Sequence, residues 1–126
     1  MRKLFLIGMV ALLAATMPAF AQSGLTRILG EKYVTVAASQ TAASMGTGAT
    51  GDKLSRLIIV PATLSPGVVQ IKDGSGTAIT VFTGGAASVA DLKPIYIEIG
   101  AISVTGKWQV TTGANVSVVA VGNFTP

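Results

Sequence analysis

Short apolar runs rich in β-branched residues follow one another from residue 54 onward, separated by Pro, Gly, Asn or Asp at intervals of about ten residues. A further run of this kind, Lys32–Ala38, precedes them. The pattern predicts an all-β fold: a single antiparallel β-sandwich, jelly-roll or Ig-like, of about seven or eight short strands. The later strands are expected at Leu54–Val60, Val68–Lys72, Thr77–Phe82, Ile95–Ile99, Lys107–Thr111 and Val116–Val121.

Alternation within the run that begins at Ile95 separates a core face from an outward face. Ile95, Ile97 and Ile99 fall on one side of a strand, and Tyr96 and Glu98 fall on the other. We therefore take Tyr96 and Glu98 as the candidate surface-binding residues.

Two other features concern the core. Trp108 and Val110 share a face, which indicates that Trp108 is buried. Leu54–Val60 and Val116–Val121 are apolar on both faces after their first residues. We expect these two runs to be central strands, or strands covered by a neighbouring subunit.

Residues 1–21 have the layout of a secretory signal peptide. Arg2 and Lys3 precede an apolar run from Leu4 to Thr16, and Ala19-Phe20-Ala21 forms a small-x-small cleavage site. The run is short for a transmembrane helix of about 20 residues. Cleavage would leave a mature chain beginning at Gln22, exported to the periplasm or the extracellular space and without a membrane segment. The alternative is that the segment is retained as a membrane anchor.

The mature chain is short enough for one domain. Residues 22–51 are expected to form an N-terminal arm, the first strand and a flexible loop rich in Gly, Ser, Thr and Ala, from Ser39 to Gly51. Residues 52–126 would form the β-sandwich core.

The tetrapeptide Asp73-Gly74-Ser75-Gly76 is the stretch most like a ligand loop. A helix-loop-helix calcium site needs oxygens at several alternate positions and a distal Glu, and a phosphate loop needs Gly-Lys-Ser/Thr at the start of a helix. Neither pattern is present in the sequence. We interpret Asp73, Gly74 and Gly76 as a structural turn, with the Asp73 side chain accepting a local backbone N–H.

The length of this turn follows from the strands on either side. A loop of three residues ending at Gly76 sets apolar residues opposite each other on one face. Hairpin loops of that length favour a left-handed residue in the last position, so positive φ is expected at Gly76. The predicted pairs are Ile71 with Ile79 and Val69 with Val81.

The composition excludes several chemistries. The chain has no Cys and no His, so disulfides, ordinary zinc or copper sites and His-dependent nucleophilic catalysis are absent. Asp91 and Glu98 are the acids whose spacing most suggests a carboxylate pair, but Asp91-Leu92-Lys93-Pro94 has the composition of a turn. We therefore expect no enzymatic activity, no catalytic residue, no metal and no cofactor.

Charge is sparse, at 11% of residues, and apolar residues make up 50%. The seven basic residues that remain after Gln22 are scattered singly, which argues against binding to nucleic acid. A small domain with little charge either exposes apolar surface or associates with other copies. The composition thus favours an assembly subunit.

Between Leu54 and Phe124 lie the segments LIIVPATLSPGVVQIKDGSGTAITVFTGG, VADLKPIYIEIG and GKWQVTTGANVSVVAVGNF. In their strand and turn texture they resemble small β-sandwich proteins of tailed phages and prophages, some of which are virion decoration or head-fibre components. The resemblance implies a structural protein that forms a homo-oligomer, a trimer by this analogy, or joins a capsid or surface lattice. It carries over no functional residue.

Two function hypotheses follow. The first is a non-enzymatic, self-assembling structural protein, located in a virion if phage-encoded or otherwise an exported surface or filament subunit. The alternative is a secreted β-sandwich module that binds a glycan or a cell surface through Tyr96 and Glu98.

Overall fold

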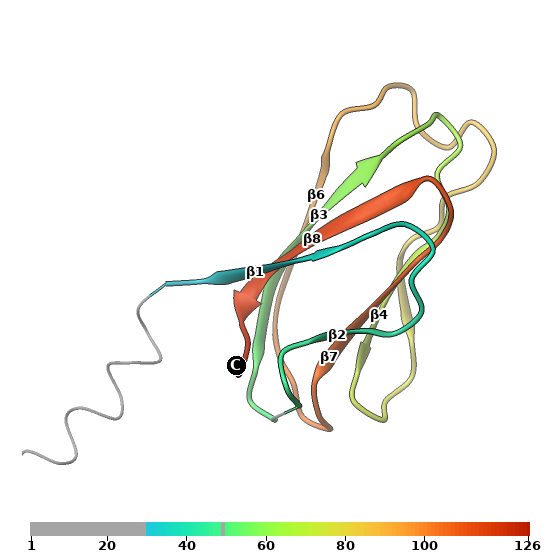
Figure 1. The fold of residues 1–126 in the computed structure, drawn as a ribbon. Helices are drawn as coiled ribbons and strands as arrows, with labels where there is room; N and C mark the ends of the chain where they lie inside the picture. The colour runs from blue at the N-terminus through green and yellow to red at the C-terminus, as the bar shows by residue number, and fades with distance from the viewer. Residues whose placement is uncertain (1–29, 49) are drawn as a thin grey trace, which may run out of the picture. The chain divides into compact units, whose positions relative to one another are not determined.

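The computed structural model describes residues 30–48 and 50–126, and these residues form two antiparallel four-stranded sheets without a helix (Figure 1). The all-β sandwich predicted from the apolar runs is confirmed. The predicted signal peptide, residues 1–21, and most of the predicted N-terminal arm lie outside the described residues.

Each sheet draws its strands from distant parts of the chain. Sheet A has the order β1 (Lys32–Val36), β8 (Val116–Asn123), β3 (Lys53–Pro61), β6 (Ile95–Ile102). Sheet B has the order β2 (Ala43–Met45), β7 (Trp108–Thr112), β4 (Val69–Asp73), β5 (Ile79–Phe82).

The antiparallel pairing is nested. β1 pairs with β8, β2 with β7, β3 with β6, and β4 with β5. The chain therefore behaves like one long hairpin that is rolled up so that successive pairs alternate between the two sheets. This arrangement leaves β1 and β6 at the edges of sheet A, and β2 and β5 at the edges of sheet B.

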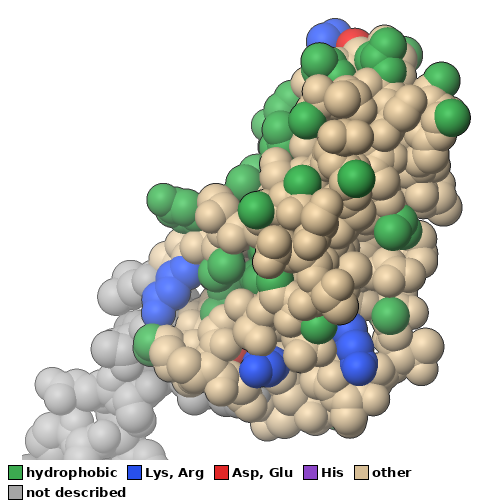
Figure 2. Space-filling model, turned by 45° about the vertical axis from the view of Figure 1, so that its right-hand side comes forward, with side chains coloured by type: hydrophobic (Ala, Val, Ile, Leu, Met, Phe, Trp, Pro, Cys, Tyr) green, Lys and Arg blue, Asp and Glu red, His purple; other side chains and the backbone are tan. Residues whose placement is uncertain are grey.

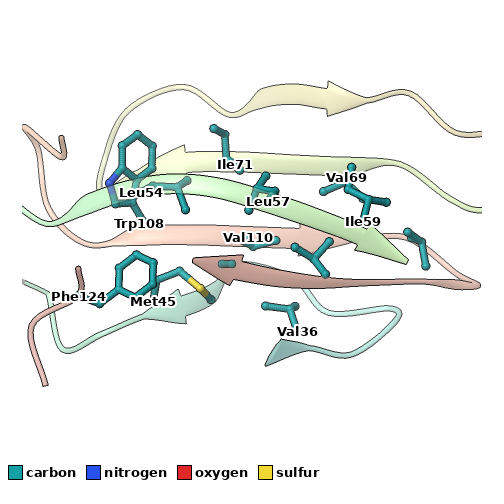
Figure 3. Packing of buried hydrophobic residues seen from close by; sticks show 13 residues of the cluster. Val36, Met45, Leu54, Leu57, Ile59, Val69, Ile71, Trp108, Val110 and Phe124 are labelled. Atoms are coloured by element: carbon teal, nitrogen blue, oxygen red, sulfur yellow. The ribbon is translucent and has the colours of Figure 1, made fainter. Parts of the chain in front are cut away.

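A hydrophobic core lies between the sheets (Figure 3). Trp108 is buried, as its alternation with Val110 predicted, and its indole Nε1 donates a 3.0 Å hydrogen bond to the Asp52 carbonyl. β3 and β8 are central strands, which confirms the prediction from their two apolar faces. The buried hydrophobic residues are Val36, Met45, Leu54, Leu57, Ile59, Val69, Ile71, Trp108, Val110, Val116, Val118, Ala120 and Phe124.

The interpretation of residues Ser39–Gly51 as one flexible loop was wrong in part. The short strand β2 lies within it, and Met45 at the end of that strand is fully buried. The segment also crosses from sheet A to sheet B along one side of the sandwich, where the Gln40 backbone N–H donates to Thr112 Oγ1 at 3.0 Å. Backbone hydrogen bonds and the burial of Met45 therefore order this segment, although its composition is typical of a linker.

Candidate functional site

The turn at Asp73 has a different geometry from the one expected. Positive φ occurs at Gly74, at +47°, and Gly76 is not among the described residues with positive φ. The Gly76 N–H donates to the Asp73 carbonyl at 2.6 Å, which closes a turn with Gly74 as its first central residue. A glycine with positive φ at that position is the pattern of a type II′ turn, so the assignment of the left-handed residue to Gly76 was wrong.

The register beyond the turn was predicted in part. Ile71 pairs with Ile79, as expected. Val69 pairs with Phe82 in place of Val81, because an irregularity between Val69 and Gln70 shifts the ladder by one residue.

Asp73 forms hydrogen bonds with residues that are distant in the sequence. Its carboxylate accepts the backbone N–H of Val104 at 2.8 Å and that of Thr105 at 3.2 Å. The Gly74 N–H in turn donates to the Lys107 carbonyl at 2.9 Å. The expectation of a local partner for the Asp73 side chain was thus wrong, because the β6–β7 turn packs against this one. These hydrogen bonds hold the turn at Asp73 against the β6–β7 turn. The Asp73 carboxylate therefore has a structural role.

The feature that stands out as a candidate site is the outer face of sheet A. One row of outward side chains crosses all four strands, with Thr35 opposite Val119, Val119 opposite Ile58, and Ile58 opposite Tyr96. Outward positions of a sandwich are ordinarily polar. Here the two central strands present four aliphatic residues beside the polar Arg56 and Ser117. The outer-face residues are Tyr33, Thr35, Arg56, Ile58, Val60, Tyr96, Glu98, Ser117, Val119 and Val121.

Two tyrosines stand at opposite edges of this face. Tyr33 on β1 is 72% exposed, and Tyr96 on β6 is 68% exposed. Three strand spacings of about 4.8 Å separate these edges, or about 14 Å. Tyr96 and Glu98 both lie on the outward side of β6, where alternation placed them. Tyr33 was not identified from the sequence, although the alternation of Val34 and Val36 with Tyr33 and Thr35 would have placed it on the outward side.

The charged groups of this face lie in the row beside the one that contains Ile58 and Tyr96. Arg56 stands opposite Glu98 in the β3–β6 register and forms an ion pair with Glu31 at 3.3 Å. Ser55 Oγ also donates to the Glu31 carboxylate. Both side chains of the ion pair are about two-fifths exposed, so the pair contributes little to stability. Its effect is to hold the residue before β1 against β3.

The other candidate acid, Asp91, takes part in a turn. Its Oδ1 accepts the Lys93 backbone N–H at 3.2 Å and its Oδ2 lies 3.3 Å from Lys93 Nζ. This local pairing agrees with the turn expected before the Ile95 strand.

Within residues 30–48 and 50–126, no group of three or more Cys, His, Asp or Glu side chains is placed to hold a metal ion. The described part of the chain also contains no helix long and apolar enough to cross a membrane. Comparison with protein-family models, curated proteins and solved structures finds no match for this chain. The resemblance to phage proteins therefore stays a prediction.

Proposed function

We propose that this protein is a non-enzymatic structural subunit that assembles with copies of itself. The observation that carries the proposal is the aliphatic centre of the outer face of sheet A. Ile58, Val60, Val119 and Val121 are partly buried, and no further element among the described residues covers them. A second copy that covers them would remove their remaining apolar surface from water, which is the main driving force of stable association.

Charge does little to oppose such contact. The molecule carries few ionisable groups, and few blue or red side chains appear on the surface drawn in Figure 2. Like-charge repulsion is the usual means by which small domains stay monomeric. A subunit with 11% charged residues lacks most of that protection.

The strand order supports the same proposal. Within the sandwich class, we assign the nested pairing of β1 with β8, β2 with β7, β3 with β6 and β4 with β5 to the jelly roll rather than to an Ig-like fold. Jelly rolls occur in viral capsid and lectin domains, which include assembly subunits as well as sugar-binding modules. Because folds host many functions, this assignment supports the proposal only together with the apolar face.

The predicted signal peptide, residues 1–21, supports a location of the assembly outside the cytoplasm. A signal peptide that is removed before Gln22 would release the mature subunit for assembly as an exported surface or filament protein. The phage resemblance adds a virion lattice as the other location.

The test compares two substitutions of an aliphatic residue by lysine. Ile58→Lys puts a charge at the centre of the outer face, whereas Val104→Lys puts one in the β6–β7 turn, where Val104 is already 76% exposed. Sedimentation velocity should show that Ile58→Lys forms smaller species than the wild type, because it loses the outer-face contact, while Val104→Lys associates like the wild type. Equal association of both variants, with circular dichroism spectra like that of the wild type, would rule out the outer face as the contact.

A second candidate function has one observation in its favour. Tyr33 and Tyr96 expose aromatic rings on the two edge strands of this face, and Arg56 lies on a strand between them, opposite Glu98 of β6. Exposed aromatic rings beside hydrogen-bonding groups are suited to stacking on sugars, so the face could bind a glycan or cell surface. Binding to a glycan array that Tyr33→Ala and Tyr96→Ala each abolish, in a protein that stays monomeric, would favour this function over assembly.

A further inference from the structure

The two sides of the sandwich are closed to different degrees. On the β1–β2 side, Val36 is 3% exposed and Met45 is fully buried. The chain between these strands crosses from one sheet to the other on this side, with the Ser39 N–H bonded to the Gly113 carbonyl at 2.9 Å.

The β5–β6 side is open. All thirteen buried hydrophobic residues come from the other six strands or from Phe124, and the described residues of β5 and β6 contribute none. Ile79 pairs with the buried Ile71 and yet is 54% exposed. The inward residues of β6 pack against the core and remain partly exposed; these are Ile95, Ile97, Ile99 and Ala101.

The connection between β5 and β6 does not cover this opening. It packs at one end of the sandwich, where the Gly85 N–H donates to the Pro66 carbonyl at 2.8 Å and the Ala87 N–H donates to Ser65 Oγ at 3.0 Å. The same end is the top of Figure 1. The apolar residues along the open side thus stay partly exposed to solvent.

The free edge of β6 also presents a backbone ready for pairing. β6 is bonded to β3 on one side, and the described residues place no strand on its other side. Pro94 precedes the strand, and a bulge occurs at Gly100, where φ is +64°. Proline and bulges interrupt edge pairing. The regular stretch that can accept another strand is therefore the five residues from Ile95 to Ile99.

We propose that β6 pairs antiparallel with β6 of a second copy, across a two-fold axis at Ile97, so that sheet A continues from one subunit into the next. The stretch is self-complementary in that register. Ile97 would lie opposite its own counterpart, and Ile95 would lie opposite Ile99. These pairs bring apolar residues together on the inner side, over the open β5–β6 side of both copies.

The charge pattern selects the same register. Glu98 is the charged residue of β6, and pairing about Ile97 sets it opposite Tyr96 of the second copy. A register centred on Glu98 would oppose two carboxylates, which is unfavourable. One centred on Tyr96 would leave Ile99 paired with Lys93, outside the strand. The two-fold contact at Ile97 is thus the arrangement that buries most apolar residues without apposing like charges.

This inference names a second contact for the proposed assembly and uses different residues from the centre of the outer face. Its test is disulfide cross-linking. Because the chain has no Cys, a disulfide can form only between the introduced residues. Residues directly opposite each other in an antiparallel pair have Cβ atoms about 4.5–5.5 Å apart, close to the separation that a disulfide requires. Ile97→Cys should therefore form a covalent dimer under mild oxidation at micromolar concentration.

The matched controls distinguish register from random collision. Ile95→Cys lies two residues from the axis and should give at least tenfold less dimer, whereas the double variant Ile95→Cys/Ile99→Cys should recover efficient cross-linking. Similar dimer yields from Ile97→Cys and Ile95→Cys, or no dimer from Ile97→Cys in a protein whose circular dichroism matches the wild type, would overturn the edge contact.

A third variant separates this inference from the proposed function. Ile58→Lys added to Ile97→Cys removes the outer-face contact and should leave the cross-link in place. If light scattering shows that the wild type associates while Ile97→Cys never cross-links, assembly stands and the edge contact fails.

Discussion

Replacing Gly74 by alanine should be among the most destabilising single-methyl changes in the protein. A Cβ at this position would lie 2.5 Å from the Thr105 carbonyl carbon and 2.6 Å from the Gly106 nitrogen, both backbone atoms. Ordinary contacts between such atoms begin near 3.4 Å. The two turns would have to separate by about 1 Å, which breaks the hydrogen bonds that the Asp73 carboxylate accepts from the β6–β7 turn.

The magnitude follows from two terms. Positive φ at a residue with a Cβ costs about 1–2 kcal/mol, and overpacking against backbone costs about 1–3 kcal/mol more. Gly74→Ala should therefore lower the free energy of unfolding by about 2–5 kcal/mol. For a domain of about 100 residues this lowers Tm by about 10 °C or more.

Gly100→Ala is the matched control. Gly100 also has positive φ, at +64°, but its Cβ would meet no described atom within 4 Å. Its cost should be that of positive φ alone, about 1–2 kcal/mol. Urea unfolding of both variants, followed by tryptophan fluorescence, measures the difference. If Gly74→Ala cost no more than Gly100→Ala, the close packing of the two turns would be wrong.

Three further predictions concern the turn, the core and the N-terminus. Asp73→Asn should lower the free energy of unfolding by about 1–3 kcal/mol, because an amide NH₂ would replace an oxygen that accepts a backbone N–H; added calcium should not raise the wild-type Tm, and a calcium-dependent rise lost in Asp73→Asn would restore the ligand-loop interpretation. Trp108→Phe should cost about 1–3 kcal/mol in thermal unfolding, since it removes the hydrogen bond to the Asp52 carbonyl and leaves space in the core, and a neutral result would contradict that packing. Intact-mass measurement of the protein from its native source should give a chain that begins at Gln22, whereas a chain that begins at Met1 would favour the membrane anchor.

Much of the sandwich could be predicted because apolar and polar residues alternate along several of its strands. The inward face of β6 is identified by Ile95, Ile97 and Ile99. The inward face of β7 is identified by Trp108 and Val110. The period of a strand is two, so a clean alternation identifies the element and its faces at once.

The parts that could not be predicted depend on partners distant in the sequence. β2 consists of Ala43, Ser44 and Met45, a composition without strand preference, and it forms because β7 lies beside it. Gly74 and Gly76 look equivalent in a local reading. The difference comes from the β6–β7 turn, which is distant in the sequence: its backbone atoms would lie 2.5–2.6 Å from a Cβ at Gly74, whereas a Cβ at Gly76 would meet the Asp73 carbonyl oxygen at 2.9 Å.

The candidate surface, too, could be predicted only in part, because it depends on strands that are distant in the sequence. Tyr96 and Glu98 could be placed on an outward face from β6 alone. That Tyr96 continues a row through Ile58 and Val119 to Thr35 depends on the order β1-β8-β3-β6, which no local pattern determines. The openness of the β5–β6 side likewise depends on where the chain crosses between the sheets.

The most direct test of the central claim is the mass of the wild-type protein in solution. Multi-angle light scattering over a range of micromolar concentrations should give a mass that is a multiple of the single chain and rises with concentration. Because the proposed contacts are apolar, that mass should persist in high salt, where surface ion pairs are screened. A single species with the mass of one chain at every concentration and salt would contradict self-assembly.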